Sequence, residues 1–160
     1  MVEEILNSYR LLIADARRMV SDIPDSQMSA QPLGLNPPAW ILGHLVYSAQ
    51  QIGGELGLAP WLPQPWIHAF RTGSRPAEQS TYPPKSELLA ALDDAFERIS
   101  RQVRTIAEAG LLQPLPDERW RTSFPTLAHA IVHILAAHTS LHLGQLSAWR
   151  RASGLTTTHI

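Results

Sequence analysis

Cysteine is absent from the 160 residues of this chain. Its absence excludes disulfides, zinc-thiolate sites and a cysteine nucleophile. Any thiol in the chemistry of this protein must therefore arrive with a substrate or a cofactor. A chain without disulfides also fits a reducing cytosol.

An excess of charge of either sign is also lacking, as are long apolar runs. The chain has 13 Lys and Arg residues against 14 Asp and Glu residues, for a formal net charge of −1. This balance provides no global field for nucleic acid or an anionic membrane surface. No apolar run reaches 18 residues, and the N-terminal segment carries acids and arginines where a secretory signal would be basic and then apolar. We expect a cytoplasmic protein that binds neither nucleic acid nor a membrane.

An alternating strand pattern is missing as well, whereas helical periodicity is clear in four segments. They run from 2 to 23, from about 37 to 58, from about 84 to 106 and from about 125 to 151. Asn36 is a candidate N-cap for the second segment, and Gly110 is a candidate C′ residue for the third. Gly57 and Gly154 mark the ends of the second and fourth segments. The sequence thus predicts an all-α protein with four long helices.

The connection between the second and third helices, from 59 to 84, is about twice as long as the other two. It is rich in proline and holds Trp61, Trp66 and Phe70, which is too much apolar surface for a free linker. A connection of this length can cross the whole bundle and let helices two and three run parallel. We predict one domain over residues 1–160, a four-helix bundle with a long crossover whose aromatic residues cover one end of the core.

Two histidine pairs with i,i+4 spacing occur in the fourth helix, His129 with His133 and His138 with His142. At about 100° per residue, the two pairs project on opposite sides of a regular α-helix. Gln145 lies on the same side as His138 and His142. That side also carries the larger apolar residues, Leu127, Ile131, Ile134, Leu135, Leu141 and Trp149. We therefore expect His138 and His142 in the core and the other pair outside it.

A third histidine, His44, lies among apolar residues in the middle of the second helix. Buried imidazoles need partners for their nitrogens, which backbone, water, neighbouring side chains or a metal ion can supply. Three core histidines from two helices can converge on one point in a bundle, and neutral imidazoles suit Zn, Ni, Fe or Cu. The pattern predicts a metal site formed by His44, His138 and His142. Gln145, one turn beyond His142, either orients a ligand or bonds to backbone.

The segments AWILGHL and HTSLHLGQLSAWRRASG resemble the DinB-like (YfiT-type) metal-binding superfamily, which has a lone histidine in helix two and an H-x-x-x-H-x-G-Q element in the last helix. The resemblance covers nearly the whole chain. It implies an up-down-down-up four-helix bundle, usually a homodimer, with a divalent metal on His44, His138 and His142. Many members carry an acid directly after the first histidine of the pair, where this chain has Thr139.

Characterised members of the superfamily that this sequence resembles include thiol-dependent S-transferases and a thiol-dependent isomerase, which use bacillithiol, mycothiol or glutathione. The resemblance favours a metal-dependent thiol S-transferase or related hydrolase that acts on a small molecule. Trp61, Trp66 and Phe70 would then shape the substrate pocket. The alternative is a non-catalytic homodimeric bundle that binds a metal or ligand, and a fourth protein ligand such as Glu55 would favour a closed, structural site.

Overall fold

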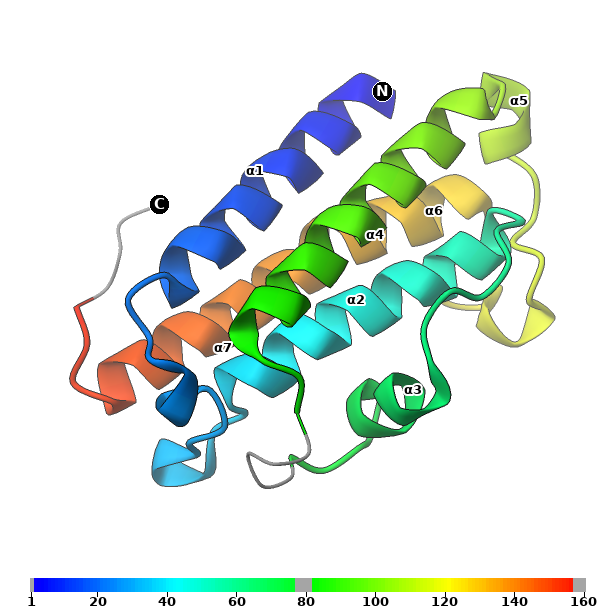
Figure 1. Cartoon of the computed structure of the whole chain (residues 1–160). Helices are drawn as coiled ribbons and strands as arrows, with labels where there is room; N and C mark the ends of the chain where they lie inside the picture. Colours follow the sequence, from blue (N-terminus) through cyan, green and yellow to red (C-terminus); the bar gives the residue numbers. More distant parts are fainter. Residues whose placement is uncertain (1, 77–81, 157–160) are drawn as a thin grey trace.

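The computed structural model describes residues 2–76 and 82–156, and their regular structure is helical (Figure 1). The long helices are α1 (Val2–Val20), α2 (Pro38–Glu55), α4 (Lys85–Thr105) and a continuous C-terminal helix. That helix comprises α6 (Leu127–Val132), the π-helical segment η5 (His133–His138) and α7 (Thr139–Ala152). The all-α prediction is confirmed. No helix in the described ranges is both long and apolar enough to span a membrane.

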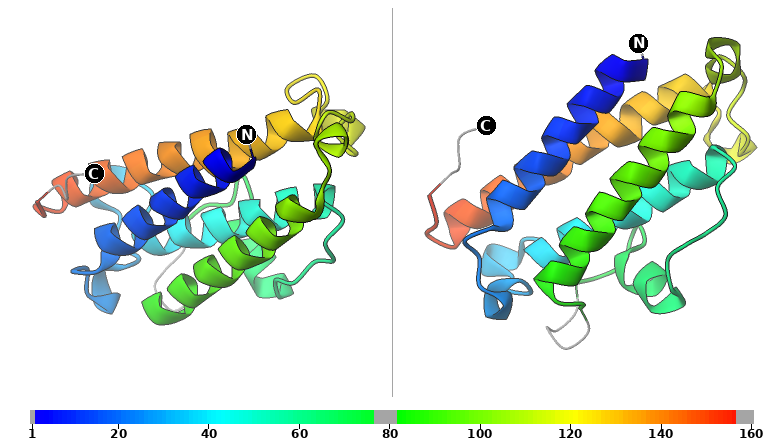
Figure 2. Two further views of the ribbon diagram at one scale, coloured as in Figure 1. Left: turned by 90° about the horizontal axis from the view of Figure 1, so that it is seen from above. Right: turned by 45° about the horizontal axis from the view of Figure 1, so that its top comes forward.

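The long helices form two layers, with α1 beside α6–α7 in one and α2 beside α4 in the other (Figure 2, left). Followed along the chain in Figure 1, α2 and α4 run in one direction, while α1 and α6–α7 run in the opposite one. Apolar residues from all of these helices form the core between the layers. They include Leu6, Ile13, Ile41, Ile52, Leu92, Ile99, Ile131, Leu146 and Trp149.

The connection between α2 and α4 contains a short helix that periodicity did not predict, α3 (Gln64–Phe70), which packs against α2 (Figure 1). The Gln50 side chain holds the start of this connection, because its Oε1 accepts hydrogen bonds from the backbone N–H groups of Trp61 and Leu62 at 2.8 and 2.6 Å. Within the described residues, the other short elements are α5 (Glu108–Leu111) and the 3₁₀ turns Asp25–Gln27, Pro32–Gly34 and Glu118–Trp120.

Two predicted helix ends are correct and two are wrong. Gly57 and Gly154 take left-handed φ values of 86° and 73° just after the C-cap residues of α2 and α7, as helix-ending glycines do. Gly110 does not end α4, because Ile106 is already extended and the glycine falls within α5. Asn36 does not cap α2, since Pro37 is the N-cap residue and no side chain bonds the first turn.

The C-terminal helix is fixed to the end of α1 by a buried charge. Arg150 is 0% exposed, and its side chain donates hydrogen bonds to both carboxylate oxygens of Asp22 and to the carbonyls of Met19 and Thr156. A buried guanidinium is tolerated when its donors are satisfied and a carboxylate faces it. This cluster sets the position of α7 relative to α1.

Candidate metal centre

His44 is 4% exposed, because α2 is packed on nearly all sides by α4, α3 and α7. Its Nδ1–H donates to the backbone carbonyl of Phe70, the last residue of α3, at 2.7 Å. A carbonyl oxygen only accepts hydrogen bonds, so the proton of the neutral ring lies on Nδ1. The Nε2 atom therefore carries a free lone pair.

His142 is 5% exposed and is held in the same way by a side chain. Its Nδ1–H donates to Oε1 of Gln145, three residues further along α7, at 3.1 Å. The same Gln145 oxygen accepts a hydrogen bond from Nδ2 of Asn36 at 3.3 Å. The lone pair of His142 is thus also on Nε2.

The two Nε2 atoms that carry these lone pairs both lie close to His138. Its Nε2 lies 3.3 Å from His44 Nε2 and 3.2 Å from His142 Nε2. Ligand atoms from the three rings all lie within 4.8 Å of one another, so the group could hold a metal ion. The structure brings together the three histidines that the sequence singled out.

The number of available protons shows why a cation fits this cluster. Three neutral imidazoles can place at most one proton among their Nε2 atoms, because His44 and His142 carry theirs on Nδ1. One proton cannot satisfy two opposing lone pairs equally, whereas a metal ion can accept electron density from all three nitrogens. The Nδ1 atom of His138 is buried and has no hydrogen-bond partner within the described residues.

Burial opposes protonation of these rings. It is the largest cause lowering the pKa of His138 to about 3, with smaller contributions from His142, His44 and His133. It also lowers the pKa of His142 to about 4 and lowers that of His44, although the Gln145 and Phe70 hydrogen bonds act in the other direction. Metal ligation requires neutral imidazole, and the site supplies it at neutral pH.

Trp40 is a neighbour of the centre that sequence reasoning did not single out. Its ring stacks on the His44 imidazole, with centroids 4.7 Å apart and planes 7° apart. Its Nε1–H donates to the Ser74 hydroxyl at 2.9 Å, and Ser74 donates to the carbonyl of Ala69. The α3 segment is thus joined to α2 through both Trp40 and His44.

The π-helical segment brings His133 towards the cluster, where an unbroken α-helix would not. Residues i and i+5 are about 140° apart around an α-helix, but they lie nearly above one another in a π-helix. The His133 and His138 rings are accordingly 6.2 Å apart between centroids, and His133 is half-buried against Phe124. The expectation that His133 projects away from His138 is wrong, whereas His129 is exposed as expected.

A second correction on the same helix concerns Leu141, which is 61% exposed rather than in the core. The buried face of α7 includes Thr139 and Leu143. Leu141 is two residues from each, or about 200° around the helix, so it faces solvent.

The three aromatic residues of the α2–α4 connection lie at different places. Phe70 is fully buried and packs on Gly43, Trp66 meets Phe70 edge-on, and Trp61 packs on Gly53. Phe70 is next to the candidate metal centre, because its backbone carbonyl accepts a hydrogen bond from His44 Nδ1. Trp61 lies further along α2, beside the C-terminal half of that helix.

Glu55 lies far from the histidines. It is 11 residues beyond His44 on α2, or roughly 16 Å along the axis, and its carboxylate accepts from the backbone N–H of Asp117. It is therefore not the fourth ligand.

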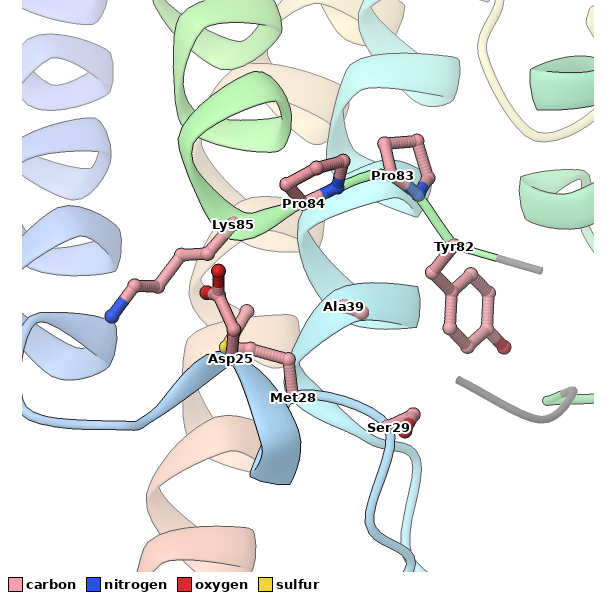
Figure 3. Close-up of a pocket in the computed structure, with 8 residues that line it drawn as sticks. All are labelled: Asp25, Met28, Ser29, Ala39, Tyr82, Pro83, Pro84 and Lys85. Atoms are coloured by element: carbon pink, nitrogen blue, oxygen red, sulfur yellow. The ribbon is translucent and has the colours of Figure 1, made fainter. Parts of the chain in front are cut away.

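A surface pocket of about 230 Å³ lies at the start of α2 and α4 (Figure 3). It is lined by Asp25, Met28, Ser29, Ala39, Tyr82, Pro83, Pro84 and Lys85. The Lys85 ammonium at its edge donates to the carbonyls of Val20, Ser21 and Ile23, and so fixes α4 to the end of α1. None of the three histidines lines this pocket.

These features define a helical bundle with a three-histidine cluster between α2 and the C-terminal helix, in which His44 and His142 are buried and His138, expected in the core, is half-buried. The family model of the DinB superfamily matches residues 9–146, which is most of the chain. The chain therefore belongs to the DinB superfamily, as the resemblance in the sequence indicated. No curated protein and no solved structure gives a significant match to it.

Proposed function

We propose that this protein is a metal-dependent enzyme of thiol chemistry, most simply an S-transferase or a related hydrolase. His44, His138 and His142 would bind one divalent transition metal ion, with Zn or Ni favoured over Fe or Cu. The observation that carries the proposal is the convergence of the Nε2 atoms of the three rings. In two of these rings, those of His44 and His142, the Nδ1–H group donates to Phe70 and Gln145 respectively.

The donor set supports catalysis rather than a structural role. Three imidazoles are neutral ligands, and no carboxylate joins them in the cluster found among the described residues. Structural zinc sites are closed by four protein ligands, whereas catalytic ones keep a position open. A metal ion held here would act as a Lewis acid and lower the pKa of a thiol or water that it binds.

The surrounding residues would hold and shield the reacting groups. Phe70 and Gln145 fix the ring orientations of two ligands, and Trp40 covers one face of His44. We propose that the segment with Trp61, Trp66 and Phe70 shapes the substrate pocket. The contact of α3, which carries Trp66 and Phe70, with α2 beside His44 supports this for those two residues. The thiol would come from a small cosubstrate such as bacillithiol, mycothiol or glutathione, because the chain has no cysteine.

Conjugation of each of the three thiols to 1-chloro-2,4-dinitrobenzene tests this function. The sulfur bonds to the aromatic carbon, chloride leaves, and the thiol proton goes to solvent. Zn- or Ni-loaded protein should accelerate the reaction with at least one thiol, and His44→Ala should remove the acceleration while His129→Ala retains it. Equal rates for loaded and chelator-treated protein with all three thiols would contradict the transferase proposal.

The alternative, a metal- or ligand-binding homodimer without catalysis, is supported by the outer face of the C-terminal helix. Ala137, Ser140 and Gly144 are exposed there, beside the largely exposed Leu141, and a Cβ atom on Gly144 would meet nothing within 4 Å. A second helix can approach closely over such small residues. We propose that this face mediates a homodimer with or without catalysis; a monomer mass by light scattering at micromolar concentration would contradict it.

We also propose the up-down-down-up topology of the bundle. The helix directions seen in Figure 1 support it.

A further inference from the structure

The loop before α2 reaches the metal centre through Asn36. Sequence reasoning gave this residue a capping role, but its side chain instead donates from Nδ2 to Oε1 of Gln145 at 3.3 Å. The same oxygen accepts from His142 Nδ1 at 3.1 Å. We propose that Asn36 is a positioning residue of the metal centre, which sets the amide orientation of Gln145 and thereby the tautomer of His142.

The Gln145 amide can face His142 with either its oxygen or its NH₂ group. With Oε1 towards His142, the ring must carry its proton on Nδ1, and Nε2 is free to bind a metal. With the amide reversed, its NH₂ group donates to Nδ1, the ring proton moves to Nε2, and ligation is blocked. The orientation of one amide thus decides whether His142 is ready to bind a metal.

With its own NH₂ group towards Gln145, as in the structure, Asn36 favours the competent orientation, because it offers an N–H group to the same oxygen. Oε1 can accept two hydrogen bonds, one from each donor, whereas an amide NH₂ group facing the Asn36 donor would leave both without an acceptor. The loop that holds Asn36 is itself anchored to α7, because Trp149 Nε1–H donates to the carbonyl of Ala30 at 2.7 Å. Asn36 therefore approaches Gln145 from a fixed segment.

Replacement by aspartate separates this role from simple electrostatics. The carboxylate introduced by Asn36→Asp only accepts hydrogen bonds, so it would turn the Gln145 NH₂ group towards itself and towards His142. Its negative charge, in contrast, would attract a metal cation. The positioning role predicts weaker metal binding in Asn36→Asp, and charge attraction alone predicts tighter binding.

The experiment measures Zn²⁺ affinity by chelator competition in four proteins, wild type, Asn36→Leu, Asn36→Asp and Gln31→Asp. We expect Asn36→Asp to bind Zn²⁺ at least about tenfold more weakly than wild type, within the roughly 10- to 100-fold range of orienting partners of metal-bound histidines. Asn36→Leu should fall in between, because Gln145 can still present its oxygen. Gln31→Asp should match wild type, since it adds the same charge to the same loop at an exposed side chain.

A second readout needs no metal. In metal-free protein, ¹⁵N NMR of the imidazole nitrogens should show the Nδ1–H tautomer of His142 in wild type and the Nε2–H tautomer in Asn36→Asp. An unchanged tautomer, or Zn²⁺ binding by Asn36→Asp as tight as in wild type, would overturn the inference. It rests on the proposed metal site, and the two fail differently: a wild type that binds no Zn²⁺ contradicts the metal site, while the tautomers still decide the role of Asn36.

Discussion

Gly43→Ala should disturb the proposed metal centre without replacing any of its three histidines. A Cβ atom built at Gly43 would lie closer than 3.0 Å to three atoms of the Phe70 ring, which is 0% exposed and cannot move outward without displacing α3. The same residue supplies the carbonyl that holds His44 Nδ1. Displacement of Phe70 therefore loosens both the packing of α3 and the orientation of a ligand.

Two opposing effects determine the size of the change. Replacing glycine by alanine inside a helix raises the free energy of unfolding by about 1 kcal/mol, whereas overpacking a filled core lowers it by roughly 1–3 kcal/mol. Losing the His44–Phe70 hydrogen bond adds about 1 kcal/mol to the cost. Gly54→Ala isolates the first term, because Gly54 lies in the same helix and a Cβ there meets nothing within 4 Å.

The assay compares urea unfolding of chelator-treated Gly43→Ala and Gly54→Ala proteins. The helix-propensity gain cancels between them, so Gly43→Ala should be less stable by roughly 2–4 kcal/mol, the sum of overpacking and the lost hydrogen bond. Its Zn²⁺ affinity should also fall, while Gly54→Ala keeps the wild-type affinity. Equal stability and equal affinity of the two variants would refute the role given to the Phe70 contact.

The ionisable groups give two further predictions. The lowered pKa values of His138 (about 3) and His142 (about 4) mean that unfolded chains take up protons below about pH 6.5 that the fold resists. The free energy of unfolding of metal-free protein, measured with urea, should therefore fall by roughly 2 kcal/mol for each of these two histidines between about pH 7 and pH 5. His138→Phe should flatten that pH dependence, and a stability independent of pH would contradict the neutral cluster. The Arg150 hydrogen bonds lower the pKa of Asp22, so this pair stabilises the fold above about pH 4 and is lost as the carboxylate protonates. At about pH 7, Asp22→Asn should destabilise the protein by more than about 1 kcal/mol. Asp94→Asn breaks the exposed pair with Arg98 and should destabilise the protein by less. Equal losses of stability would contradict a special role for the buried guanidinium of Arg150.

Much of the fold was predictable because helical periodicity is a local property. The four long helices and the glycines at 57 and 154 follow from the spacing of apolar residues and from the backbone freedom of glycine. The short helix α3 was not predicted, since its seven residues contain few turns of periodicity and begin after Pro63 in a proline-rich segment.

The three histidines were predictable for the same reason, whereas the groups that orient their rings were not. His44, His138 and His142 stand out as polar residues on apolar faces. The partner of His44 is a backbone carbonyl 26 residues away, which leaves no mark in a sequence. The π-helical turn at His133–His138 changes the angle between residues five apart, and a constant rotation of about 100° per residue therefore misplaced His133. Asn36 looked like a cap because the same residue type serves both roles.

We propose above all that one divalent metal ion binds to His44, His138 and His142. Equilibrium dialysis against Zn²⁺ followed by elemental analysis, on wild type and the variants His44→Ala, His138→Ala, His142→Ala and His129→Ala, tests it most directly. One Zn²⁺ per chain is expected in wild type and in His129→Ala, with little or none in the other three. Metal-free wild type, or equal loss in His129→Ala, would contradict the claim.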